Sequence, residues 1–136
     1  MMSTWSSAVA LEEDQCRRLL ESARVGRVGI CTADGPAVLP VNYRLLDGAI
    51  LFRTQLDSVL AEGTRDGVVA FEVDELDDRL ENGWSVLVVG RAEHLAGQEM
   101  RDLFRRLDEP WAPGARPLVA RIACTRVSGR RFDRRG

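Results

Sequence analysis

Two turn signals follow each other closely in the first half of the chain. Asp34-Gly35 and Asp47-Gly48 each separate short segments rich in β-branched and apolar residues, and Asp-Gly is a strong signal for a β-hairpin. They predict successive strands at residues 27–32, 37–43 and 49–54. Strands joined by consecutive hairpins pair antiparallel, so the pattern argues against repeated βαβ units.

The rest of the chain adds more strands and few helices. Apolar residues spaced i, i+3, i+4 and i+7 predict helices over 11–23 and 97–107. The run 68–74 is almost continuously apolar, as expected for a strand covered on both faces. The remaining predictions are a short helix at 57–62, strands at 84–93 and 118–127, an acidic loop at 75–83 and a proline-rich loop at 110–117.

About six strands in a chain of 136 residues favour a closed or half-closed barrel. The predicted fold class is therefore mainly β (α+β). We expect a loose N-terminal tail over residues 1–10, one domain over 11–132 and a C-terminal tail over 133–136.

Composition excludes several classes of protein. The formal net charge of −2 gives no electrostatic footprint for a nucleic-acid partner. No apolar stretch is long enough for a membrane span, and no signal peptide is recognisable. The three cysteines are far apart and include no C-x-x-C, which predicts free thiols, a reducing compartment and a cytoplasmic location. All 19 basic residues are arginine, so a lysine Schiff base is impossible.

Common catalytic constellations are missing. His94 is the only histidine, and its place near the end of a predicted strand favours a half-exposed strand residue over a catalytic one. No G-x-S-x-G, Walker A or G-x-G-x-x-G sequence is present. One histidine without clustered cysteines also predicts no metal site.

A polar set follows the predicted strand 49–54. Arg53, Thr54 and Ser58 lie where that strand ends and a short helix begins. An arginine fork and two hydroxyls suit a phosphate group. The same spacing also fits an ordinary strand end with a helix-capping serine.

The positions of two tryptophans also fit either a structural or a ligand-binding role. Trp84, followed by Ser85, leads a predicted strand, and Trp111 lies in the proline-rich loop. Each indole fits a core or an interface, or the wall of a pocket that holds a planar ring. The Arg130-Arg131 pair fits a solvated tail or an anion contact near a dimer seam.

Four segments together resemble a known family. They are the leading helix that ends in ARVGRVGI, then DGPAVLPVNYRLLDGAILFRTQLDSVL, VAFEVDELDDRLENGWSVLVVGRAE and RIACTRVSGRRF, and together they cover residues 11–132. In order and spacing they resemble the pyridoxamine 5′-phosphate oxidase-like proteins of the FMN-binding split-barrel superfamily. The resemblance is strongest to small members of unassigned substrate.

The resemblance implies a six-stranded antiparallel split β-barrel with flanking helices. It also implies a homodimer with two FMN sites at the subunit interface. By position, the isoalloxazine ring would lie along Pro40, Val41, Asn42 and Tyr43. The phosphate would meet Arg53, Thr54 and Ser58, while Trp84 and Ser85 would approach the flavin.

Two departures from the family pattern limit what the resemblance implies. Many relatives have a basic residue after the Ser58 position, where this chain has Val59, so a deazaflavin or haem stays an alternative to FMN. The C-terminus lacks the Arg-x-His segment of true pyridoxamine phosphate oxidases. We therefore expect an FMN-binding oxidoreductase with a different small organic substrate, and alternatively a non-catalytic binding module.

Overall fold

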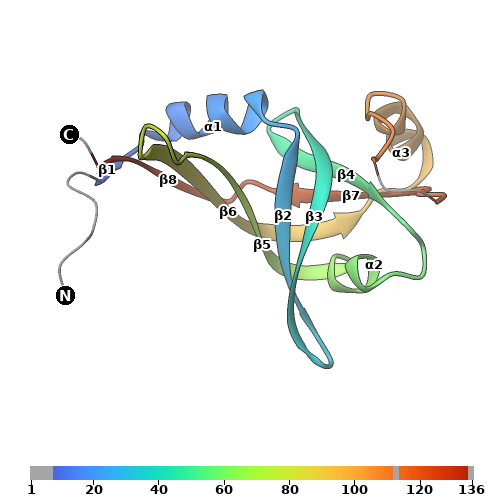
Figure 1. Ribbon diagram of the computed structural model, residues 1–136. Coiled ribbons are helices and arrows are strands. Elements are labelled where there is room, and N and C mark those ends of the chain that lie inside the picture. The colour runs from blue at the N-terminus through green and yellow to red at the C-terminus, as the bar shows by residue number, and fades with distance from the viewer. Residues whose placement is uncertain (1–7, 112–113, 135–136) are drawn as a thin grey trace.

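The computed structural model describes residues 8–111 and 114–134 of the protein (Figure 1). Its strands are β1 Ala8–Ala10, β2 Val25–Thr32, β3 Gly35–Leu46, β4 Ala49–Thr54, β5 Asp66–Asp77, β6 Asn82–His94, β7 Leu118–Ala123 and β8 Arg126–Asp133. Its helices are α1 Glu13–Ser22, α2 Val59–Gly63 and α3 Gly97–Phe104. None of these helices is long and apolar enough to cross a membrane.

Six antiparallel strands close into a barrel in the order β6-β5-β2-β3-β4-β7, with a β6–β7 pairing as the closing contact. This confirms the predicted mainly β six-stranded barrel. Strands β8 and β1 extend the sheet beyond β6, as a ribbon at one side of the molecule (Figure 1). The barrel is split because β6 pairs with β8 along residues 82–89 and with β7 along residues 92–94.

The hairpins form where the Asp-Gly pairs predict them. Asp47 and Gly48 have φ values of 52° and 79°, and they join β3 to β4. Positive φ at both central residues is the geometry of a type I′ turn, whose twist matches that of the flanking strands.

Two apolar clusters hold the barrel together. The inner cluster fills the barrel and includes Phe71 and Tyr43, whose ring centroids lie 4.7 Å apart in an edge-to-face arrangement. Helix α1 packs against it through Cys16 and Leu20. The outer cluster joins α3 to the opposite face of β4, where Leu51 packs with residues of α3 and β7.

Several boundaries differ from the sequence predictions. The predicted loop 75–83 is shorter in the structure, because β5 continues to Asp77 and β6 begins at Asn82, so only residues 78–81 form the turn. The predicted strand 118–127 is two strands, since β7 ends at Ala123 and β8 begins at Arg126. Residues 8–10, assigned to the loose tail, pair with Arg130–Phe132 of β8. The other residues of that predicted tail, 1–7, lie outside the described part of the chain.

Candidate functional site

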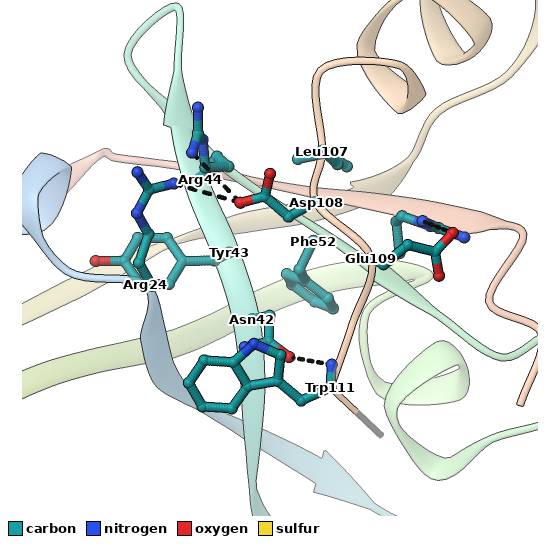
Figure 2. A pocket seen from close by; sticks show the side chains of 10 residues that line it. Arg24, Asn42, Tyr43, Arg44, Phe52, Leu107, Asp108, Glu109 and Trp111 are labelled. Atoms are coloured by element: carbon teal, nitrogen blue, oxygen red, sulfur yellow. Dashed lines mark hydrogen bonds and ion pairs between the residues drawn. The ribbon is translucent and has the colours of Figure 1, made fainter. Parts of the chain in front are cut away.

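A pocket of about 110 Å³ opens at the barrel rim beside α3 (Figure 2). The link between α1 and β2, strands β3 and β4 and the segment after α3 all contribute to it. Its lining residues are Arg24, Asn42, Tyr43, Arg44, Phe52, Arg53, Leu107, Asp108, Glu109 and Trp111. Three residues of the predicted flavin site, Asn42, Tyr43 and Arg53, therefore meet in one place.

Strand alternation sends Asn42 and Tyr43 in different directions. Tyr43 points into the barrel, is buried, and donates its hydroxyl to the Leu20 carbonyl at 2.5 Å. Burial raises the pKa of this phenol above its ordinary value. Asn42 points outward, and its Oδ1 accepts the backbone N–H of Trp111 at 2.9 Å (Figure 2). Tyr43 thus anchors the strand, while Asn42 fixes the loop over the pocket.

The two preceding residues of β3 lie outside the pocket. Val41 is buried in the inner cluster, and Pro40 is exposed on the outer surface of the sheet opposite Arg27. The structure therefore brings only the second half of the predicted ring-binding segment to the pocket.

Arg53 lies on the α3 side of β4, with a side chain that is only 10% exposed. Its Nε donates to the Arg116 carbonyl at 3.0 Å, and its Cζ lies 4.1 Å from the centre of the Phe104 ring. Its Nη1 is 3.7 Å from a Glu109 carboxylate oxygen. These contacts hold the guanidinium at the pocket wall.

Thr54 and Ser58 meet on the other side of β4. Their hydroxyl oxygens are 3.1 Å apart, and Ser58 Oγ also accepts the N–H of Ala61 at 3.0 Å and donates to the Gln55 carbonyl at 2.8 Å. Ser58 is thus the N-cap of α2. Since neighbouring strand residues face opposite sides, two of the three predicted phosphate ligands converge, and Arg53 does not join them.

Trp84 and Ser85 occupy a different region of the chain. They lie on the half of β6 that pairs with β8, opposite Arg131 and Arg130. Trp84 lines a separate hollow with Phe132. Within one chain, neither residue lines the pocket at the rim.

The most charged part of the pocket was missed by the sequence analysis. Arg24 and Arg44 approach the same carboxylate oxygen of Asp108, at 3.3 and 3.4 Å (Figure 2). Arg24 and Asp108 are 84 positions apart in the chain, so no short motif could reveal the contact. Trp111, which the sequence left between two interpretations, is 79% exposed beside the pocket.

His94 and Glu72 lie outside the pocket, and burial and neighbouring groups shift the pKa of each. Burial and the nearby charge of Arg65 lower the pKa of His94, whose Nε2 lies 3.1 Å from Thr64 Oγ1. On the outer surface of β5, Oε1 of Glu72 is buried without a hydrogen bond. Burial first, and then Asp74, raise the pKa of Glu72 to about 7. Residues 8–111 and 114–134 contain no group of three or more potential metal ligands.

Comparisons with known proteins extend over nearly the whole chain. The sequence model of the family described as pyridoxamine 5′-phosphate oxidase matches residues 12–131. An uncharacterised protein of Mycobacterium tuberculosis is 38% identical over 129 residues, which cover 91% of this chain and 85% of that protein.

Two solved structures share the fold at similar coverage. A putative pyridoxamine 5′-phosphate oxidase from Corynebacterium glutamicum is 31% identical, with a TM-score of 0.76 over 93% of this chain and 94% of that one. An FAD-binding protein from Mesorhizobium loti is 27% identical, with a TM-score of 0.76 over 91% of this chain and 97% of that one.

Proposed function

The chain belongs to the pyridoxamine 5′-phosphate oxidase-like family with its flavin-binding split-barrel fold, and from this premise we propose that it binds a flavin nucleotide and acts as an oxidoreductase on a small organic substrate. One observation carries the proposal. Asn42, Tyr43 and Arg53, which the sequence assigns to a flavin site, line one pocket together with Trp111. The FAD-binding relative from Mesorhizobium loti supports the same class of cofactor.

The pocket fits part of a flavin. Its volume of about 110 Å³ is smaller than the 300 Å³ or more that is typical of ligand sites. Aromatic and amide groups suit an isoalloxazine ring, but one chain encloses too little of it. A second copy of the chain would complete the enclosure, and it would allow Trp84 and Ser85 of the partner subunit to reach the ring.

A surface suited to such a dimer lies on the outside of the sheet. We call it the outer sheet face, defined by Val38, Val68, Ala70, Leu87 and Val89. Register places Val38, Ala70 and Val89 in one row across β3, β2, β5 and β6. Val38 and Val68 are 69% and 62% exposed. The apolar run in β5 predicts a strand covered on both faces, and a second copy would provide that cover.

In this proposal the protein binds and orients, while the flavin supplies hydride transfer when it is bound. Asn42 and the 108–111 segment hold one wall of the pocket, and the exposed indole of Trp111 stands beside it. The Tyr43 hydroxyl is engaged with Leu20, so it does not serve as a proton donor here. The side chains of this pocket therefore favour positioning over acid–base chemistry.

FMN is the proposed nucleotide. Thr54 and Ser58, two of its predicted phosphate ligands, meet on one side of β4, whereas Arg53, the third, lies on the α3 side. FAD is the competing nucleotide. Titration of apo-protein with FMN and with FAD shows which nucleotide binds more tightly. Titration with riboflavin, which lacks the phosphate, shows how much the phosphate contributes to the affinity. If Arg53 binds the phosphate, the Arg53→Ala variant should lose about tenfold or more in FMN affinity and little in riboflavin affinity.

The direct test is the absorption spectrum of the purified protein. We expect a flavin spectrum with one flavin per chain, and flavin-dependent oxidation of a reduced nicotinamide with an added electron acceptor. A protein that neither retains nor takes up any flavin would contradict the proposal. Efficient oxidation of pyridoxamine phosphate would contradict the expectation, from the missing Arg-x-His segment, that the substrate is a different one.

A non-catalytic binding module is the second candidate. It is favoured by one observation: the pocket places no histidine or free phenol beside the expected ring, since His94 contacts Thr64 and Tyr43 contacts Leu20. Flavin binding without turnover would support this module. Absorption bands of a deazaflavin or of haem in the purified protein would identify those cofactors instead.

A further inference from the structure

Two arginines from separate elements converge on a single carboxylate in the pocket. Nη1 of Arg24 and Nη1 of Arg44 lie 3.3 and 3.4 Å from the same Oδ2 of Asp108 (Figure 2). The lining as a whole contains three arginines and two acidic residues. The pocket therefore has an excess of one positive charge, which favours an anion.

The arginines belong to the barrel framework, and the carboxylate does not. The backbone N–H of Tyr43 donates to the Arg24 carbonyl at 2.9 Å, and β2 and β3 pair directly beyond it. This hydrogen bond fixes the backbones of Arg24 and Arg44 relative to each other. Asp108 comes from the segment after α3, and its side chain is 66% exposed. Exposed ion pairs contribute about 0–1 kcal/mol, so another anion can replace this carboxylate at little cost.

The surroundings of the arginine pair are those of a ligand site. Tyr43 and Phe52 close the pocket from the core side, where both are buried, and Trp111 contributes an exposed indole beside it. An exposed aromatic ring next to two guanidinium groups suits a molecule with an anionic substituent, because arginine forks bind carboxylates and phosphates with charge-assisted hydrogen bonds.

We infer that Arg24 and Arg44 form an anion site that takes the carboxylate or phosphate group of a ligand bound in this pocket, in exchange for the Asp108 carboxylate. The identity of that ligand rests on the proposed function. The anionic group belongs either to the substrate or to the flavin nucleotide. The anion site itself can be tested without any flavin.

The first experiment titrates the full chain with inorganic phosphate and follows the Nε–H resonances of its arginines by NMR. We expect the resonances of Arg24 and Arg44 to shift together, and each of Arg24→Gln and Arg44→Gln to weaken phosphate binding about fivefold. Arg91→Gln is the matched control, because Arg91 also forms an exposed pair with one aspartate, Asp66, at 2.8 Å. The control should bind phosphate like the parent.

Asp108→Asn gives the decisive comparison. If Asp108 competes with the ligand, this variant should bind phosphate several-fold more tightly than the parent, since the competing charge is gone while the amide keeps the shape. Unchanged or weaker binding in Asp108→Asn would overturn the inference. Equal phosphate binding in the parent and in both arginine variants would overturn it as well. Urea unfolding of each variant shows whether the fold is kept.

Flavin titrations then identify the source of the anion. A loss of FMN affinity in Arg24→Gln and Arg44→Gln, with riboflavin affinity unchanged, would assign the site to the cofactor phosphate. The other outcome has two parts: both flavins bind the arginine variants as they bind the parent, and the flavin-loaded parent still binds phosphate while the arginine variants do not. This outcome would assign the anion site to an acidic group of the substrate. A chain that binds phosphate at these arginines but no flavin would refute the proposed function and leave the anion site supported.

Discussion

At the scale of single residues, the Ser58 hydroxyl has two interpretations that a pair of variants can separate. It caps α2 through Ala61 N and meets Thr54, and it is also a predicted phosphate ligand. Ser58→Ala should lower the free energy of unfolding by about 1 kcal/mol in urea titrations, as for other lost N-caps. Ser58→Asp keeps a cap but repels phosphate, so it should retain stability and lose FMN affinity. If Ser58→Asp keeps full FMN affinity, Ser58 serves only as the N-cap of α2 and does not bind the phosphate.

The raised pKa of Glu72 predicts that the stability of the fold depends on pH. Its pKa is raised from 4.5 to about 7 in the folded chain, chiefly by burial, so the folded state holds a proton that the unfolded state releases. Stability from this group is therefore present below pH 4.5 and is lost as the pH rises from about 4.5 to 7. The side chain is 34% exposed, and solvent screening limits the loss to about 1 kcal/mol.

The measurement is urea unfolding at pH 5 and pH 8. Glu72→Gln should be less sensitive to pH than the parent and more stable than it at pH 8. Glu75→Gln, an exposed position on the same strand, serves as the control and should keep the parent's difference between the two pH values. A parent whose stability rises from pH 5 to pH 8 by the same amount as Glu72→Gln would show that Glu72 does not bind the proton.

At the scale of elements, the change of partner along β6 depends on Gly90. A Cβ at this position would lie 1.6 Å from the Ala123 carbonyl oxygen, where β6 leaves β8 and joins β7. Gly90→Ala must push backbone away from backbone, so we expect a loss of about 3 kcal/mol or more in unfolding free energy, beyond the usual cost of overpacking. Gly29→Ala is the control, since its nearest contact would be an ordinary 3.6 Å to Ala70. Equal unfolding midpoints for the two variants would contradict this account.

The elements also show how far sequence patterns reach. The Asp-Gly turns were predictable because turn chemistry is local. The β5–β6 hairpin was hidden by its charges, although Leu76 pairs with Gly83 and Asp77 with Asn82, because a solvated hairpin end needs few apolar residues. The boundary between β7 and β8 was hidden because the two residues between them, Cys124 and Thr125, include no glycine or proline turn signal. The approach of Thr54 to Ser58, four positions apart, was predictable, while Arg24 and Asp108 meet only through the tertiary fold.

At the scale of the whole molecule, strand β5 has one side buried in the barrel and one side exposed on the outer sheet face. Val69, Phe71 and Val73 of β5 are buried in the barrel, whereas Val68 on the opposite side is 62% exposed. Leu87 of β6, on the same outer face, is 42% exposed. An apolar outer face on a sheet whose inner face is already filled is expected to be an interface.

We therefore predict that the chain is a dimer in solution through the outer sheet face. Homodimer interfaces of this kind bury on the order of 2,000 Å², and a charge placed at the centre of one is left without a partner. Val38→Arg, whose cross-strand neighbour is Gly29, should thus give monomers at micromolar concentration in analytical ultracentrifugation, and it should weaken flavin binding because each site loses the partner's contribution. Leu56→Arg is the control, since Leu56 is also exposed but lies between β4 and α2, outside this face. A parent that sediments as a monomer with flavin bound would refute the shared site, and a Val38→Arg variant that stays dimeric would move the interface to another surface.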